Sequence, residues 1–204
     1  MRPLKKIVTR QHLGIALAFF CLGAGFFADI HPYASTQQAG ACYEKIMQSR
    51  EHDLIFDEAF DATGDKKISL QVTDAIQSAA EKENIDPLFL AAVIKQESNF
   101  RPYSASSSGG TGLMMVSENA AKGTGLDRSK LADNVEIGAM ILHRFSAAAD
   151  SADKNTALKA ALIGFYCGEA GLNAYDQNPD SIDPQVMTVT ERVMANYQQL
   201  SAKK

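Results

Sequence analysis

Apolar residues recur at intervals of three and four along most of the chain after Tyr43, and this helical spacing restricts the fold more than any other feature. The stretches end at Gly, Pro, Asp or Asn, which commonly start and stop helices. No convincing pair of segments alternates apolar and polar residues as half-buried β-strands do. The sequence therefore predicts an all-α fold. The expected helices cover 43–60, 68–83, a stretch from 86 to before Pro102, 112–122, 133–149, 157–167 and a last helix from 183.

Two Asp-Pro pairs, Asp86-Pro87 and Asp183-Pro184, mark helix starts. The Asp side chain accepts hydrogen bonds from free amides of the first turn, and Pro loses no hydrogen bond at the first helical position. Apolar residues of the last helix share one face. They are Val186, Val189, Val193, Tyr197 and Leu200.

The N-terminus differs from the rest of the chain. Four basic residues within the first ten precede an uncharged, apolar stretch at 13–28. This order is typical of an export signal, and it predicts a periplasmic location. Residues 1–28 are then a cleaved signal peptide or an uncleaved anchor in the inner membrane. The stretch is shorter than the roughly 20 apolar residues that span a bilayer, which favours cleavage.

Residues 29–41 are polar and lack apolar periodicity, so we expect a linker before one domain at 42–204. Removing residues 1–28 removes four basic and no acidic residues, leaving 16 Lys and Arg against 24 Asp and Glu, a net charge of −8. Such an acidic body argues against nucleic acid as a partner. No cluster of residues suggests a metal site, and no cofactor is expected.

The exported body contains two cysteines, Cys42 and Cys167. An oxidising compartment permits them to form a disulfide, which we predict. Two free thiols are the alternative.

Glu97 is the candidate catalytic residue. Leu90, Val93, Ile94 and Glu97 are spaced on one stripe of the helix that Asp86 opens, so the carboxyl group is expected to face the core. Burial disfavours the charged form and raises the pKa, as a general acid requires. The alternative is that the helix ends at Glu97 and its side chain turns into water.

A Ser- and Gly-rich loop at 104–112 follows Pro102. The segments Glu97-Ser-Asn-Phe-Arg-Pro and Ser106-Ser-Ser-Gly-Gly-Thr-Gly-Leu-Met resemble the signature of the soluble lytic transglycosylases, relatives of goose-type lysozyme. The family pattern is Glu-Ser-x-Phe-x-Pro, Ala-x-Ser and Gly-Ala-x-Gly-Leu-Met-Gln, and it matches without a gap through Ala121. Weaker blocks follow at 134–138 and 165–168. The resemblance covers about 72–175.

The resemblance implies a lysozyme-like helical domain with a substrate groove for peptidoglycan glycan strands. Glu97 would act as both acid and base, forming a 1,6-anhydro ring on N-acetylmuramic acid without a metal or cofactor. Small exported relatives open the wall for secretion systems, pili or flagella, which implies such a machine as a setting. The substrate-binding positions carried over are Ser106, Ser108, Gly112, Leu113, Met114, Met115, Phe165 and Tyr166.

The chain also departs from the family pattern. Met115 replaces Gln, Glu118 replaces a frequent Pro, and Phe165-Tyr166 replaces Tyr-Asn. Phe165 lacks the hydroxyl of the family Tyr, and Tyr166 is expected to miss the same place because a helix turns by about 100° per residue. These departures predict a modified groove.

Two other functions stay open. A lysozyme-type hydrolase would use a second carboxylate, such as Glu118, Asp133 or Glu136, to direct water. A non-catalytic wall-binding or assembly protein would keep the groove without the chemistry.

Overall fold

The structure is a computed structural model that describes residues 36–149 and 153–204. The expected signal or anchor at 1–28 lies outside the described residues. The chain divides into two compact units, 1–49 and 50–204. Within the described ranges, no helix combines the length and apolar character needed to cross a membrane.

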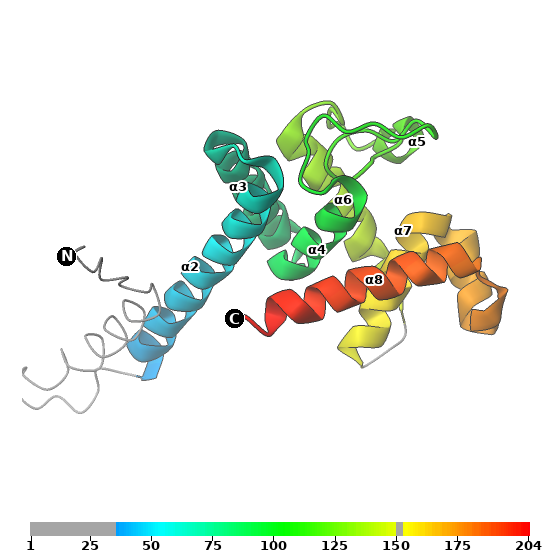
Figure 1. The fold of residues 1–204 in the computed structure, drawn as a ribbon. Helices are drawn as coiled ribbons and strands as arrows, with labels where there is room; N and C mark the ends of the chain where they lie inside the picture. Colours follow the sequence, from blue (N-terminus) through cyan, green and yellow to red (C-terminus); the bar gives the residue numbers. More distant parts are fainter. Residues whose placement is uncertain (1–35, 150–152) are drawn as a thin grey trace, which may run out of the picture. The chain divides into compact units, whose positions relative to one another are not determined.

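The described residues form helices joined by loops, so the expected all-α fold is confirmed (Figure 1). Two isolated β-bridges, Ala105–Thr111 and Thr111–Val116, fold the loop that follows α4. The elements are α2 (Thr36–Thr63), α3 (Lys66–Glu83), α4 (Pro87–Ser98), α5 (Glu118–Ala121), α6 (Leu131–Ala148), α7 (Lys154–Gln177), the 3-10 helix η2 (Pro179–Ser181) and α8 (Pro184–Ser201).

Aspartate side chains start several of these helices. Asp65 Oδ1 accepts hydrogen bonds from the amides of Lys67 (2.8 Å) and Ile68 (3.0 Å) at the start of α3. Asp86 Oδ1 accepts the Leu88 amide at 3.0 Å in α4. Each bond satisfies an amide that the helix itself leaves without a partner. Asp86-Pro87 therefore starts a helix as its sequence predicts.

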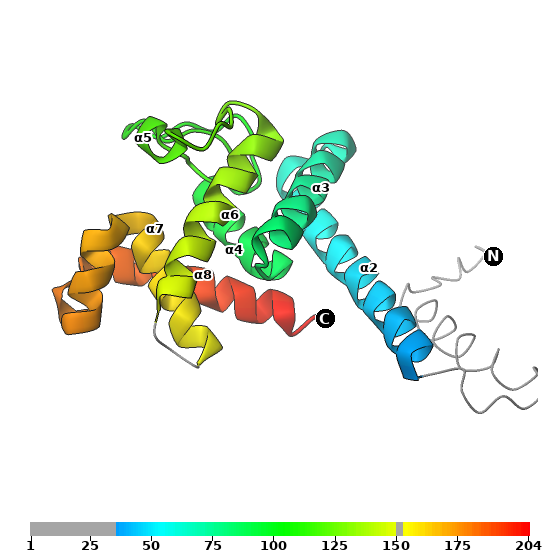
Figure 2. The same cartoon turned by 180° about the vertical axis from the view of Figure 1, so that it is seen from behind.

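Helix α4 lies in the core of the unit formed by residues 50–204. Every residue from 88 to 94 is buried, including the stripe positions Leu90, Val93 and Ile94. It packs against α8 and α3, while α6 packs against both α3 and α7 (Figure 2). A helix that is apolar on all sides is stable only when neighbours enclose it, and these helices do so.

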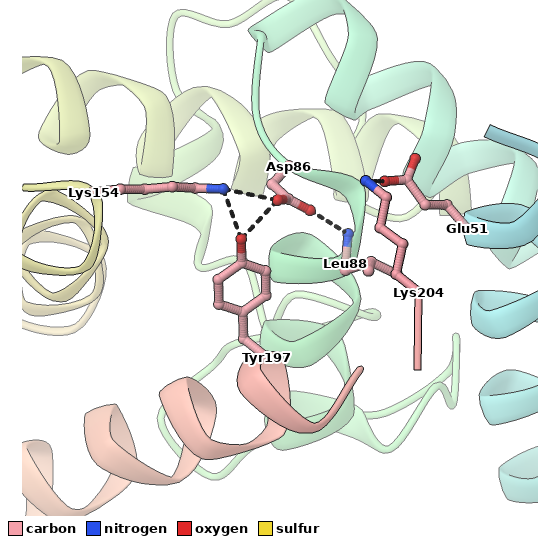
Figure 3. Close-up of polar contacts among 6 residues, drawn as sticks. All are labelled: Glu51, Asp86, Leu88, Lys154, Tyr197 and Lys204. Carbon is pink, nitrogen blue, oxygen red and sulfur yellow. Dashed lines mark hydrogen bonds and ion pairs between the residues drawn. The ribbon is translucent and has the colours of Figure 1, made fainter. Parts of the chain in front are cut away.

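A polar cluster ties the start of α4 to α7 and α8 (Figure 3). Tyr197 donates a hydrogen bond to Asp86 Oδ2 at 2.7 Å, and Lys154 Nζ lies 3.0 Å from the same oxygen and 2.7 Å from the Tyr197 hydroxyl. Nearby, Lys204 pairs with Glu51 on α2. Burial raises the pKa of Asp86, but the bonds from Tyr197 and Lys154 outweigh it and lower that pKa below its ordinary value.

The N-terminal boundary of helix α2 differs from expectation. Helix α2 begins at Thr36, so residues 36–41 of the expected linker are helical. Their Gln and Ala residues have high helix propensity despite the polar composition of the segment. The second compact unit begins at Arg50, and Ile55 is the first fully buried apolar residue among the described side chains of α2.

Two helix predictions near the site are also corrected. The helix expected at 112–122 is only the short α5, Glu118–Ala121. Residues 112–115 form turns instead, and Val116 forms a β-bridge with Thr111. The helix expected at 157–167 is longer: α7 passes through a kink at Gly168 (φ 69°, ψ −170°) and continues to Gln177. Glycine tolerates this conformation, which allows a second helical segment to follow.

Candidate active site

Glu97 lies in the last turn of α4, where the backbone turns sharply. Asn99 adopts the left-handed conformation (φ 49°) and its amide donates to the Lys95 carbonyl, ending the helix. Phe100 is also left-handed (φ 58°) and is completely buried. That conformation costs a bulky residue about 1–2 kcal/mol, which burial of the aromatic ring offsets. The helix therefore ends before Pro102, and Glu97 stays at the boundary of the core.

Tyr166 contacts Glu97 from helix α7. Its hydroxyl donates a hydrogen bond to Glu97 Oε1 at 2.8 Å. Both side chains are partly buried. Phe165 packs edge-on against the Tyr166 ring, with centroids 5.4 Å apart. Tyr166, one position after the family Tyr, therefore places its own hydroxyl against Glu97.

The two groups alter each other's protonation. Burial raises the pKa of Glu97, the hydrogen bond from Tyr166 lowers it, and burial dominates, so that the pKa lies above its ordinary value. Burial, followed by the nearby Glu97 charge, raises the pKa of the Tyr166 phenol well above normal. Tyr166 therefore remains a hydrogen-bond donor, and Glu97 holds its proton more readily than an exposed carboxyl group.

Arg128 holds the loop that follows the helix of Glu97. Its Nη1 donates to the carbonyls of Gly109 and Val116, both at 3.0 Å, and lies 3.1 Å from Thr111 Oγ1. One guanidinium group thus joins three points of the loop. Arg128 could not be predicted as a functional residue, because it lies between the recognised blocks and no local sequence pattern indicates this role.

Asn134 holds the same loop from α6. Its Oδ1 accepts the Met114 amide at 2.9 Å, and its Nδ2 donates to the carbonyls of Thr111 and Arg128, each at 2.9 Å. Gly112 lies directly against this amide with φ 80°, where a Cβ would overlap the Asn134 side chain. Asn134 belongs to the block at 134–138, and its contacts give that block a structural role.

The serines at the tip of the loop interact mainly with each other and with the backbone. Ser106 Oγ accepts the Gly110 amide at 2.9 Å and lies 2.9 Å from Ser108 Oγ. Ser106 is half-buried and Ser108 is exposed. Ser106 thus closes the turn, while Ser108 faces solvent.

The comparison with protein families identifies the kind of domain. The model of the family described as the transglycosylase SLT domain matches residues 74–186, more than half of the chain. The chain belongs to this family. The resemblance to soluble lytic transglycosylases is thereby confirmed.

A curated relative agrees with the SLT assignment. The chain is 36% identical over 98 residues to the membrane-bound lytic murein transglycosylase F of Desulfosudis oleivorans. The alignment covers 46% of this chain and 21% of the relative. The chain thus spans about a fifth of the length of the relative that it matches.

Some positions carried over from the SLT signature do not face solvent. Gly112, Leu113 and Met114 are buried, the last two completely, so that the side chains of Leu113 and Met114 face the core. Their assignment to the groove wall stays a prediction. They fill the space beneath the loop, where Met114 packs close to Gly138 of α6. Met115 is half-buried and left-handed (φ 48°).

The other carboxylates considered for this SLT domain have separate contacts. Glu136 pairs with Lys82 of α3 at 2.7 Å. Asp133 accepts the Asp127 amide at 3.0 Å. Glu118 is exposed on α5. Two of the three candidates are therefore engaged in stabilising their own surroundings.

Cys167 follows Tyr166 in α7, is half-buried, and forms no disulfide with another side chain that the structure describes. The side chain of Cys42, its predicted disulfide partner, lies outside the described residues. The pairing stays a prediction.

Proposed function

We propose that this chain is a peptidoglycan lytic transglycosylase that cleaves the bond between N-acetylmuramic acid and N-acetylglucosamine. The observation that carries the proposal is the hydrogen bond from Tyr166 to the partly buried Glu97. Burial raises the pKa of this carboxyl group, and the hydrogen bond gives it a defined orientation at the position that matches the family acid. Membership of the transglycosylase SLT family indicates the reaction, cleavage of a glycan, in which a carboxyl group of this kind serves as the acid.

In the first step, Glu97 protonates the glycosidic oxygen. Its Oε1 accepts the Tyr166 hydrogen bond, so the acid proton resides on Oε2, the oxygen left to meet the substrate. As the proton leaves, negative charge develops on the carboxylate. The Tyr166 bond becomes charge-assisted at that moment and stabilises the charge in the transition state.

In the second step, the carboxylate acts as a base. The acetamido oxygen of the muramic acid stabilises the developing cation, and Glu97 takes the proton from the O6 hydroxyl of the same sugar. O6 then bonds to the anomeric carbon and closes a 1,6-anhydro ring. This attack has the entropic advantage of a nucleophile already tethered to the reacting centre. Tyr166 keeps the carboxylate oriented through both steps.

Hydrolysis has less support in the site. Activation of water requires a second carboxylate across the scissile bond, and Glu136 and Asp133 are engaged by Lys82 and the Asp127 amide. Glu118 makes no such contact with residues 36–149 or 153–204, and its exposure on α5 leaves its carboxylate accessible to solvent. These contacts favour ring closure over hydrolysis.

The setting follows from the N-terminal sequence. The basic start and the apolar stretch at 13–28 support action in the periplasm, by way of a cleaved signal or an inner-membrane anchor. The proposed sites of action in the periplasm include the cell wall around a secretion, pilus or flagellar machine.

Digestion of purified peptidoglycan followed by mass analysis tests the reaction. We expect fragments ending in 1,6-anhydro-N-acetylmuramic acid, and Glu97→Gln should reduce their release by at least about 10²- to 10⁴-fold, since Gln cannot deliver the proton. Fragments about 18 Da heavier, with a free reducing end, would assign hydrolysis instead. Binding to the wall without any fragments would favour the non-catalytic alternative.

A further inference from the structure

A cleft of about 390 Å³ lies beside the loop that leaves the helix of Glu97. Its apolar lining comes from Ala62, Ile68 and Pro102, on α2, α3 and the loop. None of the residues assigned to the reaction lines it. The remaining lining residues are polar or aromatic: Thr63, Arg101, Tyr103 and Ser104.

Several polar groups of this cleft have no partner among residues 36–149 and 153–204. Arg101 forms no ion pair or side-chain hydrogen bond there, and the hydroxyls of Tyr103 and Ser104 are likewise free. Tyr103 is 90% exposed. The Thr63 hydroxyl, in contrast, is engaged with Ala59 O at 2.8 Å and with Ser69 Oγ at 3.0 Å. The free groups therefore comprise one cation and two hydroxyls around an apolar floor.

We propose that this cleft binds the stem peptide of peptidoglycan, with Arg101 paired to one of the peptide's carboxylates. The inference rests on the proposed function insofar as the cell wall is the substrate. The planar guanidinium offers a fork of donors that matches a carboxylate. Residues 29–204 carry a net charge of −8, so an unpaired cation at the mouth of a cleft provides local attraction for an anionic ligand.

A peptide suits the lining better than a sugar ring does. Stem peptides combine carboxylates with small alanine methyl groups, and the floor of Ala62, Ile68 and Pro102 can cover such methyl groups. The sugar rings of a strand that carries stem peptides are uncharged, because the lactyl carboxylate of each muramic acid is consumed in the amide bond to its peptide. A sugar ring would therefore leave Arg101 without an anionic partner, whereas the peptide supplies one.

The position of the cleft suits a substrate that Glu97 cleaves. Arg101 lies four residues after Glu97, and its amide donates to Ser98 O at 3.2 Å, which links the cleft to the end of α4. The Ser104 carbonyl accepts the Gly112 amide at 2.9 Å, so the other end of this segment is fixed to the loop held by Asn134. A peptide bound here would fix the muramic acid that carries it relative to the acid.

Calorimetric titration of the full chain carrying Glu97→Gln tests the proposal without turnover. The probes are a disaccharide tetrapeptide, the same molecule with amidated peptide carboxylates, and the peptide-free disaccharide with its lactyl carboxylate. We expect Arg101→Gln to weaken binding of the acidic tetrapeptide roughly three- to fivefold, as for one exposed charge pair, and to leave the amidated form unchanged. Arg101→Lys should weaken binding of the acidic tetrapeptide less than Arg101→Gln does, because it keeps the positive charge. The control is Lys67→Gln, which removes an exposed cation outside the lining and should change the affinity for neither the acidic nor the amidated tetrapeptide.

Three outcomes overturn the proposal. They are equal binding of the acidic and amidated tetrapeptides, equal effects of Arg101→Gln and Lys67→Gln, and equal weakening of the peptide-free disaccharide by Arg101→Gln, which would assign the carboxylate to the sugar. Failure of the reaction is separable from failure of the cleft. If wild-type protein releases no fragments but binding depends on the peptide carboxylates through Arg101, the cleft stands and the proposed reaction falls.

Discussion

At the scale of single residues, the site depends on a pair that is 69 positions apart in the chain. A buried carboxyl group alone gains a raised pKa but no defined orientation. The Tyr166 hydroxyl supplies orientation and moderates the shift, because its hydrogen bond favours the charged form of Glu97. In this chain, a Tyr one position after the family Tyr thus provides a hydroxyl to the acid.

Tyr166→Phe tests this role. Losing a hydrogen bond to a charged group typically costs about 1.5–3 kcal/mol, so kcat should fall by roughly one to two orders of magnitude. The bond lowers the pKa of Glu97, so its loss should raise that pKa and move the alkaline limb of the activity profile to higher pH. Release of fragments from peptidoglycan across a range of pH measures both effects.

Tyr175→Phe is the matched control, since Tyr175 is half-buried on the same helix and makes no side-chain hydrogen bond to another described residue. Its rate and pH profile should equal those of the wild type. An unshifted profile in Tyr166→Phe would mean that Tyr166 does not orient the acid.

At the scale of elements, the loop after α4 is irregular in backbone but fixed by side chains. Arg128 and Asn134 together bind the carbonyls of Gly109, Thr111 and Val116 and the amide of Met114. In a helix, backbone amides and carbonyls form hydrogen bonds with each other. In this irregular loop, several of these groups bond to side chains instead. The small size of Gly112 allows the Asn134 amide to approach.

Gly112→Ala should destabilise the fold by about 3 kcal/mol or more. A Cβ at this position overlaps the Asn134 amide, and φ 80° strains any side chain. Gly123→Ala is a close control, because its φ of 81° is nearly the same but no atom lies near the added Cβ, so only the backbone cost of about 1 kcal/mol applies. Urea denaturation of both variants compares them. Equal losses would show that Asn134 moves aside without cost.

At the scale of the unit formed by residues 50–204, three helices meet at Asp86 (Figure 3). This residue starts α4, accepts the Tyr197 hydroxyl of α8 and pairs with Lys154 at the start of α7. The cluster lies at the end of α4 opposite to Glu97. It therefore fixes the position of the helix that carries the acid and of the helix that carries Tyr166.

Tyr197→Phe should cost about 1–2 kcal/mol of unfolding free energy near neutral pH, because the Asp86 carboxylate loses a donor. The pKa of Asp86 is lowered in the folded state, so this stabilisation is present above the unfolded pKa of about 3.9 and is lost as the pH falls through the folded value. The deficit of the variant should accordingly shrink in acid. Thermal melts at several pH values measure it, with Tyr103→Phe as the exposed control. A deficit independent of pH would contradict a role through Asp86.

Features that depend on a few neighbouring residues could be predicted from the sequence. Helical periodicity, the Asp-Pro starts and the placement of Glu97 on an apolar stripe are local, and the gapless signature after Glu97 identified the family. Which groups meet depends on the tertiary structure. Tyr166 of α7 reaches Glu97 at the end of α4 across 69 positions of the chain, and Leu113 and Met114 are buried because Arg128 and Asn134 hold the loop against α6. Such contacts depend on how whole helices pack, which residue spacing along the chain does not encode.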